Sequence, residues 1–177
     1  IAHGGYLLVG LVSANQIGKA AILFYLAAYA ITNLAAFGAI ALLGTRARAN
    51  DDLGDYAGLW RTHPAAAGLM AVALLSLGGL PPTAGFIGKW YIFSAAIAAG
   101  YYGLAIIGVL TSVVSVFFYL RVVVMMYMSD GDPANVAPRI SRAGIATLAV
   151  AAAVIFYLGI LPTRLLDLAA ASIATIF

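Results

Sequence analysis

The chain has 177 residues, of which 64% are hydrophobic and only 8% are charged, and its mean hydropathy is +1.05. Soluble domains carry about 25% charged residues, so this composition indicates an integral membrane protein. The absence of cysteine excludes disulfides, thiolate metal ligands and thiol catalysis. The net charge of +3 comes from basic residues in two loops, and it gives no reason to expect nucleic-acid binding.

Apolar stretches of helical length follow one another along the chain. A bilayer core about 30 Å thick requires about 20 apolar residues in a helix. The sequence therefore predicts an all-α, polytopic membrane domain over 1–177, with spans at 1–14 (truncated), 20–43, 63–99, 101–128 and 143–161. The tail 162–177 either extends the last helix or lies at the membrane interface. Because the chain starts within an apolar run and without a methionine, we expect a fragment of a longer protein.

Basic residues in the connections indicate the orientation. One side of the membrane receives five arginines, and the other receives Lys19 and Arg164. The five are Arg46, Arg48, Arg61, Arg139 and Arg142. The positive-inside rule then predicts that this side is cytoplasmic and that the C-terminus lies on the outer face.

The segment 63–99 is too long for one straight span, and its centre reads GGLPP. Proline has no N–H, and its ring conflicts with the carbonyl four residues earlier, whereas glycine tolerates unusual backbone. The sequence predicts a helix broken at Gly78, Gly79, Pro81 and Pro82. Pro81 suits the first position of the second half-helix and Thr83 can cap it. A simple proline kink for packing is the alternative.

Lys89 lies about two turns beyond this break. A charge at the bilayer centre costs about 2.5–3.5 kcal/mol on insertion scales, so the lysine must be paired, hydrated or neutral. A buried lysine next to a broken helix can load and release a proton, and broken helices mark the ion sites of transporters. We predict a proton-relay role for Lys89; a structural ion pair is the alternative.

Other polar residues at membrane depth are few. Histidine as a residue type titrates near neutrality, so His3 is either a second proton-relay residue or a hydrogen-bonded histidine between helices. Thr32 and Asn33 either orient water or serve packing. Ser76 and Thr83 flank the break and are candidates to satisfy freed backbone groups.

Four segments carry a resemblance to a known family. They are IAHGGYLLVGLV, YLAAYAITNLAAFGAI, GGLPPTAGFIGKWYIF and FYLRVVVMMY. Together they resemble the C-terminal third of subunit N of respiratory complex I, an antiporter-like membrane subunit. The string PPTAGFIGK is the most specific of these matches. The resemblance implies that this chain forms the last helices of a larger bundle. It also implies that Lys89 and His3 belong to a chain of protonatable groups across the membrane.

The family's key glutamate and two further lysines lie on helices absent here, so the fragment alone is not expected to translocate protons. The resemblance implies that electrons pass from NADH to quinone in partner subunits, which hold FMN and iron–sulfur clusters. No cofactor or metal is expected in this chain. The implied partners are other membrane-arm subunits and the lipid of a bacterial inner membrane. Two alternatives remain: a subunit of a multisubunit cation/proton antiporter, and a membrane scaffold in which Lys89 only forms an ion pair.

Overall fold

The computed structural model describes residues 2–44, 52–131 and 140–176. Every regular element in these ranges is a helix, which confirms the predicted all-α fold class. In chain order the elements are α1 (Ala2–Ser13), α2 (Gln16–Leu43), the 3-10 helix η1 (Leu53–Tyr56), α3 (Leu59–Thr62), α4 (Pro64–Gly78), α5 (Ala84–Ala98), α6 (Tyr102–Met128), α7 (Arg142–Ile160) and α8 (Thr163–Ile176).

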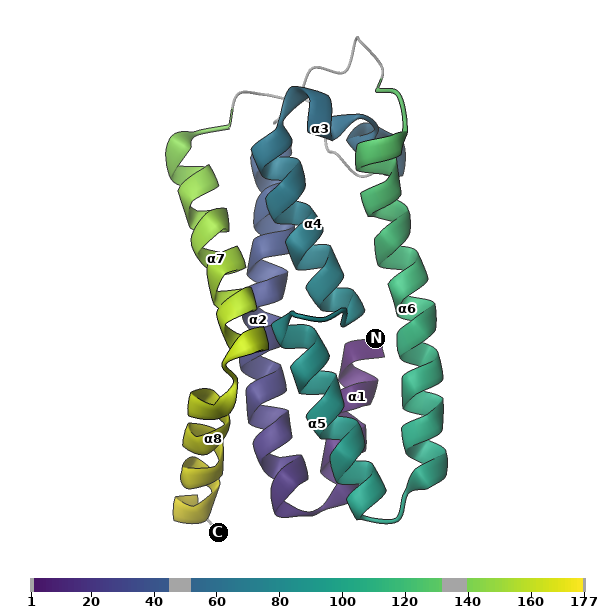
Figure 1. The fold of residues 1–177 in the computed structure, drawn as a ribbon, viewed down its shortest axis with the longest axis vertical. Helices are drawn as coiled ribbons and strands as arrows, with labels where there is room; N and C mark the ends of the chain where they lie inside the picture. The colour runs from purple at the N-terminus through teal and green to yellow at the C-terminus, as the bar shows by residue number, and fades with distance from the viewer. Residues whose placement is uncertain (1, 45–51, 132–139, 177) are drawn as a thin grey trace.

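Three of the described helices, α2, α6 and α7, are long and apolar enough to cross a membrane. Helices α4 and α5 are shorter and stand end to end between α2 and α6 (Figure 1). Together they run the length of the bundle that α2 covers alone. The discontinuous helix predicted within 63–99 is therefore confirmed as part of the fold.

Helix α2 is the centre of the bundle, since it packs against α1, α4, α5, α7 and α8. Its buried face is built largely from alanine, and small residues let helix backbones approach closely in a membrane. These alanines are Ala21, Ala28, Ala35, Ala36 and Ala39. The consequence is that α2 holds both halves of the broken helix against one continuous support.

The turn between α1 and α2 is fastened to α5 by Asn15. Its side-chain oxygen accepts a hydrogen bond from the Gly18 N–H at 2.7 Å, which caps α2. Its side-chain nitrogen donates to the Ala95 carbonyl at 2.9 Å. One side chain therefore both starts α2 and fixes this end of the bundle.

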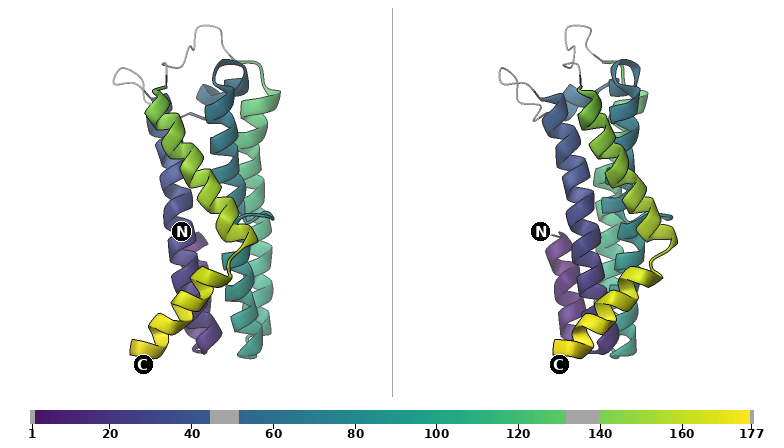
Figure 2. Two further views of the ribbon diagram at one scale, coloured as in Figure 1. Left: turned by 60° about the vertical axis from the view of Figure 1, so that its left-hand side comes forward. Right: turned by 90° about the vertical axis from the view of Figure 1, so that its left-hand side faces the viewer.

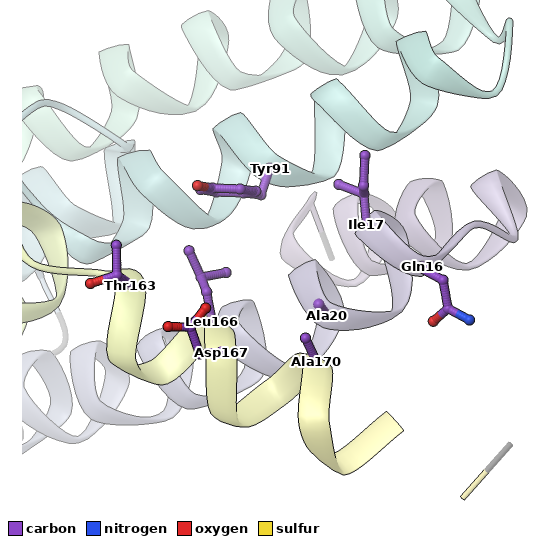
Figure 3. Close-up of a pocket in the computed structure, with 8 residues that line it drawn as sticks. All are labelled: Gln16, Ile17, Ala20, Tyr91, Thr163, Leu166, Asp167 and Ala170. Atoms are coloured by element: carbon purple, nitrogen blue, oxygen red, sulfur yellow. The ribbon is translucent and has the colours of Figure 1, made fainter. Parts of the chain in front are cut away.

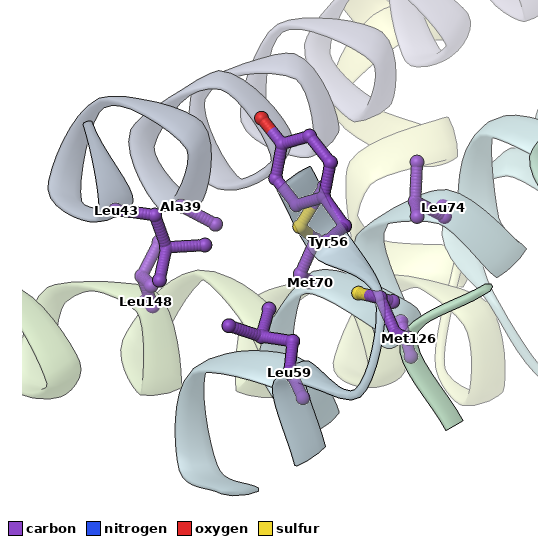
Figure 4. Packing of buried hydrophobic residues seen from close by; sticks show 10 residues of the cluster. Ala39, Leu43, Tyr56, Leu59, Met70, Leu74, Met126 and Leu148 are labelled. Carbon is purple, nitrogen blue, oxygen red and sulfur yellow. The ribbon is translucent and has the colours of Figure 1, made fainter. Parts of the chain in front are cut away.

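Within the described ranges, buried apolar residues form three clusters. Figure 4 shows the one in which η1 and α3 pack against the ends of α2, α4, α6 and α7. It contains Ala39, Leu43, Tyr56, Leu59, Ala67, Met70, Ala71, Leu74, Met126 and Leu148. The second cluster joins α2, α4, α5 and α7 and includes Leu77 and Ala84, which flank the break. The two half-helices are thus held by packing on both sides of their interruption.

The tail forms a helix of its own. Helix α7 ends at Ile160, and α8 then runs obliquely to it and packs against α2 (Figure 2). Pro162 explains the bend, because it has no N–H and disfavours helical backbone in the residue before it. The tail therefore does not continue α7 as a straight helix.

Part of the charge pattern used for the orientation lies outside the described residues, namely Arg46, Arg48 and Arg139. Arg61 of α3 and Arg142 of α7 lie at the same end of the bundle (Figure 1). Arg61 forms an exposed ion pair with Asp130 at 2.9 Å. Which end faces the cytoplasm stays a prediction.

Candidate functional site

The side chain of Lys89 reaches from α5 into the break between α4 and α5. It is only 4% exposed. Its ammonium group donates to the main-chain carbonyls of Leu77 at 3.1 Å and Gly78 at 2.7 Å, and to the hydroxyl of Ser112 at 3.0 Å. An ammonium group has three donors, so all three are used. The lysine therefore joins the end of α4, the body of α5 and the middle of α6.

These two carbonyls are free because α4 ends there. The last four carbonyls of a helix have no partner within it. In α4, Gly79 has the left-handed conformation at φ 84°, and its N–H bonds to Ser76 O at 2.9 Å. The Leu80 N–H bonds to Leu75 O at 3.0 Å. This Schellman arrangement satisfies two of the four carbonyls. Lys89 satisfies the remaining two, so a cation lies at the negative end of the α4 dipole.

Ser76 stabilises the start of α5. Its hydroxyl accepts a hydrogen bond from the Gly85 N–H at 3.2 Å. The prediction that Pro81 takes the first helical position is wrong. Thr83 does stand at the N-cap position of α5, but its side chain makes no capping hydrogen bond. Helix α5 begins at Ala84, so the prolines lie in the linker, and the Thr83 hydroxyl bonds back to Leu80 O at 2.7 Å. The cap is supplied from α4 because the two half-helices meet closely at this point.

The linker between α4 and α5 can face lipid because its exposed residues have no backbone N–H to pair. Pro81 and Pro82 are exposed on the surface of the bundle. Since proline has no N–H, exposing this backbone leaves no donor unpaired. On the inner side, Gly159 of α7 packs so closely on the Pro82 carbonyl that a Cβ atom there would overlap it. The irregular backbone is therefore covered on one side by α7.

The described groups that contact Lys89 carry no negative charge. Its stem packs on Gly79, where an added Cβ would lie 2.8 Å from the lysine Cδ. Its ammonium nitrogen lies 5.0 Å from the centre of the Tyr6 ring, within range of a cation–π interaction. Among the described residues, no carboxylate forms an ion pair with it. The charge is balanced by dipoles and a π face, so the ion-pair alternative has no support within this part of the chain.

His3 occupies a second buried polar site, formed by tyrosines. The histidine is 7% exposed. Its Nδ1 lies 2.6 Å from the Tyr25 hydroxyl and its Nε2 lies 2.9 Å from the Tyr119 hydroxyl. The ring of Tyr29 stacks on it at 4.7 Å between centroids. A hydroxyl can both donate and accept, so either tautomer of the histidine is satisfied without movement of the ring.

Tyr6 connects the two sites. Its ring contacts His3 edge to face at 5.9 Å between centroids and, as described above, also faces the Lys89 ammonium group. Its own hydroxyl is buried and has no hydrogen-bond partner among the described residues. An unpaired buried hydroxyl is costly, which indicates a place for water or for a polar group next to it.

A small cavity lies between His3 and the break. It has a volume of about 10 Å³ for the centre of a water-sized sphere, close to the room that one water needs. Its lining includes His3, Tyr25, Tyr29, Thr32 and Ser76. The hydroxyls of Thr32 and Ser76 are 3.2 Å apart. This strip of hydroxyl groups extends from the histidine to the cap of α5.

The structure thus brings most of the predicted site residues together. Lys89, Gly78 and Ser76 meet at the break, and His3 and Thr32 line the adjoining cavity. Asn33 is half-buried and lies outside that lining, because successive residues of a helix point about 100° apart. Five further residues of the site were not predicted from the sequence: Tyr6, Tyr25, Tyr29, Tyr119 and Ser112. One signal in the sequence could have indicated the tyrosines: positions 25, 29 and 32 are spaced to share one polar face of α2.

A larger cavity lies apart from these residues, where α8 crosses α2 and α5 (Figure 3). It measures about 350 Å³, and its lining is mostly apolar, with Asp167 and Thr163 contributed by α8. Neither Lys89 nor His3 lines it. Among the described residues there is no cluster of histidine and acidic side chains that could hold a metal ion.

Comparison with known proteins identifies the family. Residues 1–115 match the NADH:quinone oxidoreductase/Mrp antiporter transmembrane family. The chain is 46% identical over 173 residues to NADH-quinone oxidoreductase subunit N of Trichlorobacter lovleyi, covering 96% of this chain and 35% of the relative. It is likewise 46% identical over 173 residues to NADH-quinone oxidoreductase subunit N 1 of Solidesulfovibrio magneticus, covering 97% of this chain and 37% of the relative. The chain belongs to the NADH:quinone oxidoreductase/Mrp antiporter transmembrane family.

Two solved structures show the same fold. Respiratory complex I from Thermus thermophilus with bound aureothin contains a chain with a TM-score of 0.76 and 28% identity, covering 93% of this chain and 37% of that one. The Mrp complex from Dietzia sp. DQ12-45-1b contains a chain with a TM-score of 0.81 and 25% identity, covering 93% of this chain and 39% of that one. The antiporter-like membrane fold is therefore confirmed, as is the resemblance found in the sequence. This chain spans about a third of the length of its curated relatives.

Proposed function

We propose that this chain is part of a proton-translocating membrane subunit of an NADH-quinone oxidoreductase, in which Lys89 and His3 relay protons. The observation that carries the proposal is the setting of Lys89. A buried lysine donates to the open end of a broken helix, where its ammonium group is stabilised without a carboxylate among the described residues. Such a group can give up its proton without leaving a buried unpaired anion behind.

The second support is the closeness of His3 to Lys89, with one tyrosine side chain between them. Tyr6 touches both residues, and the cavity beside His3 has room for about one water. The hydroxyls of Tyr25 and Tyr119 lie within hydrogen-bond distance of the imidazole of His3, so a proton can pass between these groups without large motions of the helices. Thr32 and Ser76 support the path as positioning groups, because their hydroxyls line the cavity.

Electron transfer from NADH to quinone belongs, in this proposal, to partner subunits that hold FMN and iron–sulfur clusters. The chain itself binds no cofactor and supplies the translocation step. Other membrane-arm subunits are its neighbours in the inner membrane of a bacterium. The segment alone is not active, because the family's remaining protonatable groups lie on other helices.

A second candidate function is that of a subunit in a cation/proton antiporter. The similarity to the Mrp complex favours it, since that TM-score, 0.81, is higher than the 0.76 with complex I. The identities to subunit N chains, at 46% over nearly the whole segment, favour the quinone reductase.

The test is Lys89→Ala in the complete subunit, assembled in its complex and assayed in inverted membrane vesicles. Quinone reduction by NADH and vesicle acidification are followed together. Arg121→Ala is the matched control, since Arg121 is an exposed cation on α6. We expect Lys89→Ala to lower both activities while the control keeps them. Unchanged activities in an assembled complex would refute the relay, and loss of sodium-driven proton exchange alone would establish the antiporter.

A further inference from the structure

The three acceptors around Lys89 differ in what they can do with a proton. The carbonyl oxygens of Leu77 and Gly78 can only accept hydrogen bonds, whereas the hydroxyl of Ser112 can accept one and donate another. When Lys89 loses its proton, its nitrogen gains a lone pair that requires a donor. Ser112 is the member of this set that can turn its hydroxyl and supply that donor.

Ser112 also occupies the more open side of the lysine. Leu77 and Gly78, whose carbonyls accept from Lys89, are both buried. The Tyr6 ring and Gly79 cover two other sides of the ammonium group. Ser112 is half-buried, on the α6 face that meets the break. A proton leaving the lysine through the carbonyls would have no onward carrier. A proton leaving through the serine can continue to a water on its open side.

We propose that Ser112 is the group through which Lys89 exchanges its proton, and this assignment rests on the proposed function of Lys89. In the step, one N–H bond of the ammonium breaks as an O–H bond forms on Ser112. The serine's original O–H bond breaks at the same time, and that proton passes to a water molecule. Lys89 is left neutral, Ser112 is left unchanged, and the water carries the charge onward. Re-protonation runs through the same atoms in reverse.

The test uses a pair of variants of similar shape. Ser112→Thr keeps the hydroxyl, and Ser112→Val replaces it with a methyl group, while both add the same branch to α6. Ser112→Ala removes the hydroxyl without adding volume. Ser115→Ala is the control, because that hydroxyl lies one turn away and bonds within its own helix to Thr111 O at 3.0 Å. All variants are made in the assembled complex and assayed for acidification coupled to quinone reduction.

We expect Ser112→Ala and Ser112→Val to slow proton translocation roughly tenfold, which corresponds to about 1.4 kcal/mol in the barrier. Ser112→Thr and Ser115→Ala should keep the original rate. Equal rates for Ser112→Thr and Ser112→Val would overturn the assignment, because the hydroxyl is their functional difference. If Lys89→Ala stops translocation and every Ser112 variant is normal, the assignment of Ser112 is refuted and the proposed function of Lys89 stands. If Lys89→Ala is also normal, the proposed function fails with it.

Discussion

The hydroxyl of Ser76 should contribute measurably to the stability of the broken helix. Ser76 is 1% exposed, and its oxygen accepts the hydrogen bond of the Gly85 N–H at the start of α5. The change Ser76→Ala leaves that buried N–H without an acceptor. Thr32, the other partner of this hydroxyl, keeps its bond to Ala28 O at 2.7 Å and is not left unpaired. The cost therefore falls on one backbone donor.

A buried donor without a partner costs about 1–3 kcal/mol, which sets the expected loss in unfolding free energy. At about 2–4 °C per kcal/mol, the melting temperature should fall by roughly 2–12 °C. The assay is thermal unfolding of the purified subunit in detergent, followed by intrinsic fluorescence. Ser172→Ala is the matched control, since that exposed hydroxyl bonds only within its own helix, to Leu168 O. If both variants melt at the same temperature, α5 does not depend on a cap from α4 and this account of the break is wrong.

Three further substitutions should each lower the free energy of unfolding, measured in the same assay. Gly88→Ala should cost about 1–3 kcal/mol, because the new Cβ would lie 2.5 Å from a ring carbon of Tyr25, whereas Gly103→Ala meets nothing within 4 Å and should be neutral or stabilising. Asn15→Ala should cost about 0.5–2 kcal/mol through loss of the α2 cap, and Asn15→Ser, which keeps a capping oxygen, should cost less. Tyr119→Phe removes one hydrogen bond to the histidine of α1 and should cost about 0.5–1.5 kcal/mol; no loss would show that this bond is not formed.

The broken helix could be predicted from the sequence because its causes are local. Two prolines and two glycines within five residues leave few helical hydrogen bonds to be made. The same reasoning indicated that the carbonyls of Leu77 and Gly78 would lose their partners. It did not reveal that Lys89 would replace them, since that depends on how the chain turns between residues 79 and 83. Only the folded path of the linker brings the lysine back to the end of α4.

The cap of α5 shows a second limit. A threonine immediately before a helix is a strong local signal for capping. Here Thr83 bonds to Leu80 O instead, and Ser76 provides the acceptor from the other half-helix. A tertiary contact decided this hydrogen bond.

The tyrosines around His3 were overlooked for a different reason. Tyrosine in a membrane protein is commonly an interfacial anchor, and Tyr25 and Tyr29 carry no motif that marks them otherwise. Their spacing with Thr32 did place a polar stripe on one face of α2. That Tyr119, from a helix far along the chain, would complete the site could come only from the arrangement of α6 beside α1.

The balance of Lys89 by carbonyl dipoles has a consequence outside this chain. The field of a dipole decays faster with distance than that of a charge, so a protonated Lys89 retains most of its positive potential away from its immediate neighbours. At 15 Å, with an effective dielectric constant of about 20, a unit charge shifts the energy of another by about 1 kcal/mol. A lysine paired with a carboxylate would have almost no net electrostatic effect at that distance. In the proposed relay, each gain or loss of a proton by Lys89 would therefore change the electrostatic potential in whatever helices adjoin the bundle.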